Sequence, residues 1–224
     1  MRILYLHGIG SGADSRTPRT LRTLLPEAEI IAPELPIRPG EAVKFIRDNY
    51  LDEEFDLVIG TSLGGFYAQT LWLHKKILVN PAMYADEDII KAIGYCTHEF
   101  LCERSDGAKE YTIDEAFISE LAKIRKMIYG NRDMMHPDKL DVNECNLTYA
   151  LFGEKDILVS HYDDFCKWYI PDHAYRFAGG HRMETEETKG VLLPLIEKVT
   201  AEPDAPLCFV LDDFQNDAHE QDRN

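Results

Sequence analysis

The chain has 224 residues, of which 24 are Lys or Arg and 40 are Asp or Glu, so its formal net charge is −16. This length suits one large domain with a continuous buried core and is short for two independent domains. The negative charge repels nucleic acid and anionic membrane surfaces, and no stretch approaches the roughly 20 apolar residues of a membrane span. We therefore expect one domain that binds neither nucleic acid nor membrane.

The N-terminus and the cysteines indicate a cytoplasmic protein. The apolar run before His7 is too short for a signal peptide, and no small-residue cleavage site follows it. Five cysteines are an odd number and show no C-x-x-C spacing, which favours reduced thiols over disulfides or a metal site. These cysteines are Cys96, Cys102, Cys145, Cys166 and Cys208.

Short apolar runs bounded by turn residues alternate with amphipathic stretches along the chain. This alternation predicts right-handed βα units and an α/β fold with a doubly wound, mostly parallel sheet that is buried on both faces. The six expected strands are Ile3–Leu6, Glu29–Ala32, Asp56–Thr61, Lys76–Asn80, Asn146–Phe152 and Ala174–Ala178. The expected helices are Thr17–Leu25, Gly40–Tyr50, Leu63–His74, His161–Tyr169 and Glu186–Val199.

About sixty residues separate the strand that ends at Asn80 from the next strand, which indicates an insertion at about 83–142. Insertions after the carboxyl end of a strand lie above the ligand crevice of an open α/β sheet, so we expect a helical cap. Two helices are expected in it, Asp86–Ile93 and Thr112–Met127, the second with a capping box that starts at Thr112. The side chains named as candidates to face the pocket are Met83, Tyr84, Tyr95, Phe100, Phe117 and Met134.

The last segment, 201–224, holds seven acidic residues against Arg223 alone. Such a composition is typical of a solvated tail, so we expect the folded domain to span 1–200. One apolar cluster in the tail, Leu207–Leu211, leaves open whether this part docks on the domain or pairs as an edge strand.

The segment Gly60-Thr61-Ser62-Leu63-Gly64 follows an apolar strand and opens an amphipathic stretch. In this context of strand, turn and helix, a G-x-S-x-G pattern indicates a nucleophile elbow, because the turn exposes the serine hydroxyl at the start of a helix. Ser62 is therefore the predicted nucleophile. The alternative is a tight turn that only caps a helix.

A serine hydroxyl needs a base to take its proton, so a histidine must follow in the chain. His181 stands directly after the last predicted strand and after a glycine pair that lets the loop fold back toward Ser62. The other histidines weighed for this role are His161, His136, His98 and His173, which lie in predicted helix, cap or loop positions, and His7, which lies beside the site. His181 is the predicted base.

The third member of such a triad is a carboxylate that accepts the imidazole N–H. Asp156 follows the strand that ends at Phe152 and precedes His181 by 25 residues, which makes it the leading candidate. The rivals are Asp133, Asp163, Asp164 and Glu154. For the oxyanion of the intermediate, two backbone N–H groups are expected, one from Leu63 and one from Ile9 in the glycine-rich loop after the first strand.

Four segments together resemble the small bacterial YqiA-like esterases of the α/β-hydrolase superfamily, and the likeness spans roughly residues 1–199. These segments are Leu4-Tyr5-Leu6-His7-Gly8, Ile31-Ala32-Pro33-Glu34-Leu35-Pro36, Gly60-Thr61-Ser62-Leu63-Gly64-Gly65-Phe66-Tyr67-Ala68 and Val79-Asn80-Pro81-Ala82. The resemblance implies an α/β-hydrolase fold and hydrolysis of carboxylic esters with small acyl groups.

We therefore expect a serine hydrolase that cleaves a small carboxylic ester or thioester through an acyl-serine intermediate, with a small acyl compound as substrate and no cofactor. The alternative from another functional class is a ligand-binding or scaffolding protein with a hydrolase fold, because one fold can serve several functions.

Overall fold

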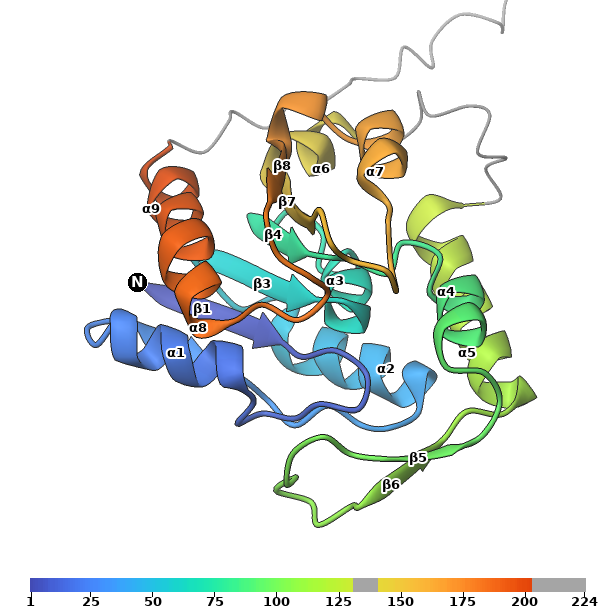
Figure 1. Ribbon diagram of the computed structural model, residues 1–224. Helices are drawn as coiled ribbons and strands as arrows, with labels where there is room; N and C mark the ends of the chain where they lie inside the picture. The colour runs from blue at the N-terminus through green and yellow to red at the C-terminus, as the bar shows by residue number, and fades with distance from the viewer. Residues whose placement is uncertain (131–140, 203–224) are drawn as a thin grey trace, which may run out of the picture.

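The computed structural model describes residues 1–130 and 141–202. Its centre is a six-stranded sheet in the order β2-β1-β3-β4-β7-β8, and every neighbouring pair is parallel (Figure 1). The strands are β1 (Arg2–Leu6), β2 (Glu29–Ile31), β3 (Leu57–Thr61), β4 (Lys76–Val79), β7 (Thr148–Gly153) and β8 (Ala174–Phe177). All six predicted strands are confirmed, with ends that differ by one or two residues.

Both faces of this sheet are buried, which explains why its strands are continuous apolar runs. Along β1, Leu4 and Leu6 belong to one core cluster, whereas Ile3 and Tyr5 belong to another. This alternation follows from the two-residue repeat of a strand, which turns successive side chains to opposite faces.

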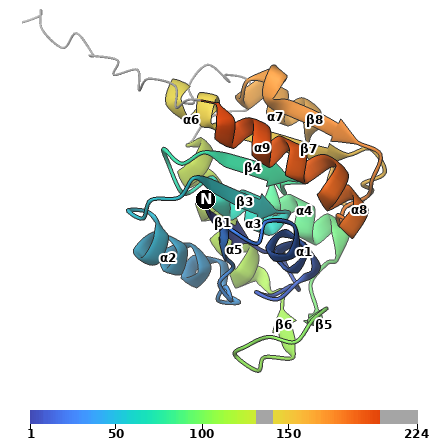
Figure 2. The ribbon, with the colours of Figure 1, turned by 90° about the vertical axis from the view of Figure 1, so that its left-hand side faces the viewer.

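Helices cover the two faces in two layers (Figure 2). One core cluster packs under helices that follow β2, β3, β4 and β7, and the other packs under the first and last helices of the chain. The first layer holds α2 (Pro39–Tyr50), α3 (Leu63–Ala68), α4 (Ala85–Ala92), α5 (Glu115–Tyr129) and α7 (Tyr162–Trp168). The second holds α1 (Arg16–Leu24), α8 (Thr185–Glu187) and α9 (Leu193–Ala201).

The predicted helix Leu63–His74 is shorter than expected, because α3 ends at Ala68. The N–H groups of Thr70 and Leu71 bond to carbonyls three residues back, which tightens the chain, and Leu73 has a positive φ of 62° that no helix continues. The last predicted helix is also interrupted. A π turn at Thr188–Leu192 precedes α9, whose Pro194 lacks the N–H that a continuous α-helix would use.

The insertion between β4 and β7 differs most from the expectation. The predicted capping box at Thr112 is wrong, since α5 begins after Asp114, whose carboxylate accepts a hydrogen bond from the N–H of Phe117. Thr112 instead ends β6 (Glu110–Thr112), which pairs with β5 (Thr97–Glu99) in an antiparallel hairpin that we did not predict. The short helix α6 (Val142–Leu147) replaces the start of the strand expected from Asn146.

The hairpin stands apart from the main sheet in Figure 1 and reaches the loop after β1, where the N–H of Leu101 donates to the carbonyl of Gly10. Within the described ranges, no helix is long and apolar enough to cross a membrane. Several sequence predictions lie outside the described residues, namely those on Asp133, Met134, His136, Cys208 and Leu207–Leu211.

Candidate active site

Ser62 sits between the end of β3 and the start of α3 with a strained backbone, at φ 54° and ψ −118°. The turn brings chain segments so close that only glycine fits beside the serine. A Cβ on Gly60 would lie 2.4 Å from the carbonyl oxygen of Gly64, and one on Gly64 would lie 2.1 Å from that of Leu6. Both glycines of the G-x-S-x-G pattern are therefore required by packing, and Ser62 has the strained strand-to-helix turn that the pattern predicts.

Ser62, His181 and Asp156 form one continuous chain of hydrogen bonds. The Oγ atom of Ser62 lies 2.9 Å from Nε2 of His181, and Nδ1 of His181 lies 2.7 Å from Oδ2 of Asp156. The Asp156 side chain is 1% exposed and that of His181 is 17% exposed. The other carboxylate oxygen of Asp156 accepts hydrogen bonds from the N–H groups of Leu158 and Val159, so the carboxylate is fixed in orientation.

The other candidates for the base and the acid either bond to other residues or are exposed. His161 bonds to Asp164 at 2.9 Å through Nδ1 and to Asp88 at 2.9 Å through Nε2, which engages both in a separate cluster. Asp163 and Glu154 are exposed. His98 contacts Cys96, and His173 contacts the carbonyl of Thr148. The structure thus brings together the three residues that the sequence analysis ranked first.

Asn80 connects the loops that carry His181 and Asp156, a role that sequence analysis missed. Its amide Nδ2 donates to the carbonyls of Gly180 and His181, both at 3.0 Å, and its Oδ1 accepts from the N–H of Gly153 at 2.7 Å. The side chain is buried and its backbone has a positive φ of 44°. The signal in the sequence was an Asn-Pro pair at the carboxyl end of a strand next to the elbow.

Leu63 and Ile9, the predicted oxyanion donors, follow Ser62 and belong to the loop after β1, respectively. Leu63 is the first residue of α3, so its N–H has no acceptor within the helix. The loop that holds Ile9 runs against the elbow, because a Cβ on Gly8 would lie 3.1 Å from Cβ and 3.7 Å from Oγ of Ser62. This contact explains the glycine after His7 and places the loop within reach of the reacting oxygen.

His7 holds this loop in place and is buried. The N–H of Leu35 donates to Nε2 of His7 at 3.1 Å, so Nε2 carries no hydrogen, and Nδ1–H donates to the carbonyl of Gly8 at 3.0 Å. Oε1 of Glu34 approaches Nε2 at 3.4 Å, but the N–H of Leu35 already occupies the lone pair of that nitrogen. His7 therefore joins the loop after β1 to the loop after β2.

Arg104 comes from the loop of the β5–β6 hairpin, and its side chain is 1% exposed. Its guanidinium contacts Glu34 at 2.9 Å, Asp106 at 2.6 Å and the carbonyl of Leu35 at 2.8 Å. Burial favours the neutral form of Glu34, but hydrogen-bonding groups around it and the Arg104 charge outweigh this and lower its pKa. The Arg104 charge is thus balanced inside the protein, and the hairpin is attached to both loops.

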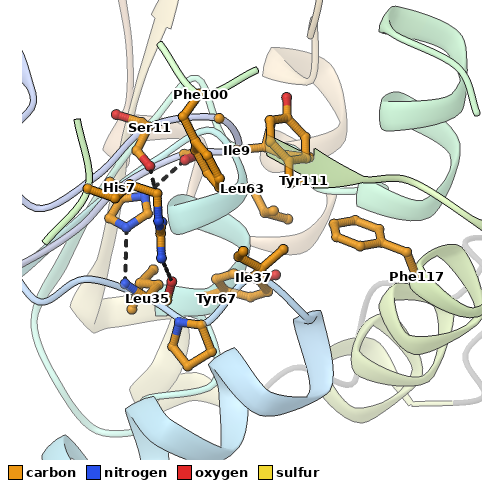
Figure 3. A pocket seen from close by; sticks show the side chains of 14 residues that line it. His7, Ile9, Ser11, Leu35, Ile37, Leu63, Tyr67, Phe100, Tyr111 and Phe117 are labelled. Atoms are coloured by element: carbon orange, nitrogen blue, oxygen red, sulfur yellow. Dashed lines mark hydrogen bonds between the residues drawn. The ribbon is translucent and has the colours of Figure 1, made fainter. Parts of the chain in front are cut away.

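A small hollow that opens to solvent is lined by Gly8, whose backbone lies against Ser62, and by Leu63, which follows Ser62 in the chain (Figure 3). Of the six cap side chains named from the sequence, Phe100 and Phe117 line it. Met83 and Tyr84 are buried in the core instead, Tyr95 is 55% exposed, and Met134 lies outside the described residues. The full lining is His7, Gly8, Ile9, Gly10, Ser11, Leu35, Pro36, Ile37, Leu63, Tyr67, Phe100, Arg104, Tyr111 and Phe117.

Solved structures with the same architecture are α/β-hydrolases. The monoacylglycerol lipase of Paleococcus ferrophilus is 12% identical with a TM-score of 0.55, over 89% of this chain and 94% of that one. Mouse alpha/beta hydrolase domain-containing protein 10 is 16% identical with a TM-score of 0.56, over 88% and 90%. Est1E from Butyrivibrio proteoclasticus is 13% identical with a TM-score of 0.54, over 90% and 88%. At these identities the likeness shows the fold, and the predicted α/β-hydrolase fold is confirmed.

A family model also matches the sequence itself, over residues 2–140. The matched part holds the loop after β1, the turn at Ser62, Asn80 and the hairpin with Arg104. This match covers more than half of the chain and agrees with the resemblance to YqiA-like proteins that the sequence motifs indicated. The chain therefore belongs to the uncharacterised protein family UPF0227 and has an α/β-hydrolase fold.

Proposed function

We propose that this protein is a serine hydrolase that cleaves a small carboxylic ester or thioester through an acyl-serine intermediate. The observation that supports this most is the unbroken chain of hydrogen bonds from Ser62 through His181 to Asp156, at 2.9 and 2.7 Å. These distances lie within the range that a nucleophile, its base and an orienting acid need for proton transfer.

In the acylation step, Oγ of Ser62 attacks the substrate carbonyl carbon while Nε2 of His181 takes the hydroxyl proton. The negative charge that develops on the carbonyl oxygen is stabilised by the N–H groups of Leu63 and Ile9. The imidazolium then gives its proton to the leaving alcohol or thiol as the bond to the carbonyl carbon breaks. Asp156 stabilises the imidazolium and keeps Nδ1 protonated throughout.

In the deacylation step, His181 takes a proton from a water molecule, whose oxygen attacks the acyl-serine carbonyl. The tetrahedral intermediate uses the same two N–H donors, and its collapse returns the proton to Oγ of Ser62 and releases the acid. All groups in this cycle belong to the chain or to the substrate, so the reaction as written requires no cofactor.

The first test is the substitution Ser62→Ala, assayed with a nitrophenyl ester of a short acid and with a fluorophosphonate probe. The wild-type protein is expected to hydrolyse the ester and to be labelled at Ser62. The variant should lose labelling and at least a hundredfold of the turnover, because removal of a triad member leaves only binding and the oxyanion donors.

A folded wild-type protein that the probe does not label and that cleaves no ester would contradict the proposal. It would favour the other class considered above, a ligand-binding protein on a hydrolase fold. Turnover of the variant above a tenth of the wild-type value would show that Ser62 is not the nucleophile.

A further inference from the structure

The end of β4 contacts the turn at Ser62 as well as the loops of the acid and the base. The N–H of Ser62 donates to the carbonyl of Val79 at 2.9 Å, and the N–H of Ala82 donates to the carbonyl of Ser62 at 3.2 Å. Asn80 lies between Val79 and Ala82 in the chain. The nucleophile and the side chain of Asn80 are therefore attached to the same short stretch of backbone.

The loops of the acid and the base lie directly against each other. A Cβ on Gly153 would lie 2.6 Å from the carbonyl oxygen of Gly180 and 2.7 Å from that of Gly179. Both of these glycines precede His181 and have no side chain to pack, and a glycine backbone loses more freedom than any other when it is fixed. The backbone that carries His181 therefore depends on contacts from outside its own loop.

The side chain of Asn80 supplies such contacts with both of its polar atoms. Nδ2 carries two hydrogens and reaches two carbonyls, those of Gly180 and His181, and Oδ1 accepts the N–H of Gly153. The residue is 1% exposed, and its backbone N–H donates to the carbonyl of Leu151 on β7 at 2.8 Å. An ionised carboxylate could not donate to the two carbonyls, and an apolar side chain could bond to none of the three groups.

Asn80 restrains His181 at a second point. The ring is held at Nδ1, 2.7 Å from Oδ2 of Asp156, and the backbone is held at its carbonyl, 3.0 Å from Nδ2 of Asn80. Ser62 is bonded to the end of β4 as well, and Nε2 of His181 lies 2.9 Å from its Oγ. Misplacement of a reacting group by about 1 Å can lower a rate about 100-fold, so this restraint matters for proton transfer.

We propose that Asn80 is a positioning residue of the triad, which sets the place of His181 relative to Ser62 and needs a side-chain amide to do so. This proposal rests on the proposed function and adds a fourth side chain to it. Asn80 acts through His181 and does not touch the substrate.

The first variant that tests this is Asn80→Gly, because glycine accepts the positive φ of 44° at this position without strain. It should lower kcat for a short-chain nitrophenyl ester by about ten- to a hundredfold, because the base is no longer held in place. KM should stay within about twofold, because the buried side chain does not reach the substrate.

Asn80→Asp is the second variant and tests the need for an amide. It keeps the size of the side chain and the acceptor for the N–H of Gly153. Even a protonated carboxyl can donate to only one of the two carbonyls, so kcat should fall by about three- to tenfold, the value of one hydrogen bond.

Gln69→Ala is the matched control. Gln69 is also a buried side-chain amide with three hydrogen-bond partners, which are Gly65, Tyr129 and Tyr169. Its loss should lower the melting temperature and leave kcat within about threefold, because it bonds to neither loop of the triad. Equal losses of kcat in Asn80→Gly and Gln69→Ala would overturn the proposal, and so would a rise of KM in Asn80→Gly at unchanged kcat.

Hydrogen exchange measures the contacts without any turnover and so separates this proposal from the proposed function. The peptides that contain Gly153 and His181 should exchange their backbone N–H hydrogens at least about tenfold faster in Asn80→Gly than in the wild-type protein, and at the wild-type rate in Gln69→Ala. Unchanged exchange in Asn80→Gly would contradict the positioning role even if the protein is an esterase. Faster exchange in a protein that cleaves no ester would refute the proposed function and still support Asn80 as the residue that holds His181.

Discussion

Both carboxylate oxygens of Asp156 take part in hydrogen bonds that fix the orientation of the side chain. One carboxylate oxygen receives two backbone N–H groups and the other faces Nδ1 of His181, so no oxygen is left to rotate toward water. Asn80 fixes the loops on both sides of this pair through three hydrogen bonds. Asp156 and the loop of His181 therefore each have further contacts that set their positions, which a precise proton transfer needs.

The substitution Asp156→Asn should lower kcat about 10⁴-fold, the loss seen for the same change in a serine protease triad. The new amide N–H would face Nδ1 of His181 and favour the tautomer with a hydrogen on Nε2, which cannot accept the proton of Ser62. Ester turnover at pH 8 measures this. Asp163→Asn is the control, because that carboxylate is exposed on the first turn of α7, and it should cost less than tenfold.

Asp164 is unsuited as a neutral control, since it takes part in the His161 cluster. If Asp163→Asn proved as damaging as Asp156→Asn, the assignment of the acid would be wrong although Ser62 would remain the proposed nucleophile.

At the scale of elements, His161 joins α4 of the insertion to α7 of the main fold. Both ring nitrogens face carboxylates at 2.9 Å, Asp88 on α4 and Asp164 on α7, and the ring packs edge-on against Tyr84 at 4.8 Å. Burial favours the neutral ring, but the two carboxylates outweigh it and raise the pKa of His161. When the imidazole is protonated, it donates from both nitrogens and connects the two helices.

This contact makes stability depend on pH in a defined direction. Because the folded pKa of His161 is raised, its contribution is complete below the ordinary value of about 6.5 and is lost as pH rises through the folded value. The melting temperature lost in His161→Gln should therefore be larger at pH 6 than at pH 9, by about 2–4 °C for a contribution near 1 kcal/mol. Thermal unfolding from pH 5 to pH 9 tests this.

His173→Gln provides the opposite case for comparison. Burial lowers the pKa of His173, so its contribution is present above about pH 6.5 and is lost as pH falls. The melting temperature lost in this variant should grow with pH. Equal losses at pH 6 and pH 9 for His161→Gln would contradict a protonated link between α4 and α7.

At the scale of the whole molecule, Glu202, the last described residue, forms hydrogen bonds next to the sheet. Its carbonyl accepts from Nζ of Lys75, and its carboxylate accepts from the hydroxyl of Tyr149 on β7. These contacts connect the end of α9 to β7 and to the residue before β4. The acidic stretch that follows from 203 to 224 is distinguished by its composition, with six acids and one arginine.

Truncation after Glu202 is predicted to leave the melting temperature and ester turnover near the full-length values, because the removed stretch is charged and poor in core residues. Truncation after Thr200 should lower the melting temperature by several degrees, because it also removes the two contacts of Glu202. Thermal unfolding of the two shortened proteins against the full chain measures the difference. A large loss of melting temperature in the protein truncated after Glu202 would show that Leu207–Leu211 docks on the fold.

Much of the architecture was predictable from short windows of sequence. The strands of the main sheet are mostly apolar runs of three to six residues, and the turn at Ser62 has glycines that are dictated by chain contacts within the segment 60–65 and with β1. Chain order then restricted the acid and the base to segments after later strands, which is how Asp156 and His181 were ranked first. The hairpin β5–β6 was missed because its strands have only three residues each and carry little periodicity.

The sequence by itself determined the α/β class, the order of the strands along the chain and the three residues of the proposed triad, because each is marked by local periodicity or turn chemistry. Only the tertiary structure decided which distant groups meet. Asn80 bonds to residues 73 and 100 positions away, and Arg104 bonds to one 69 positions away. No local pattern encodes such contacts, since they depend on how the sheet, the helices and the insertion pack together.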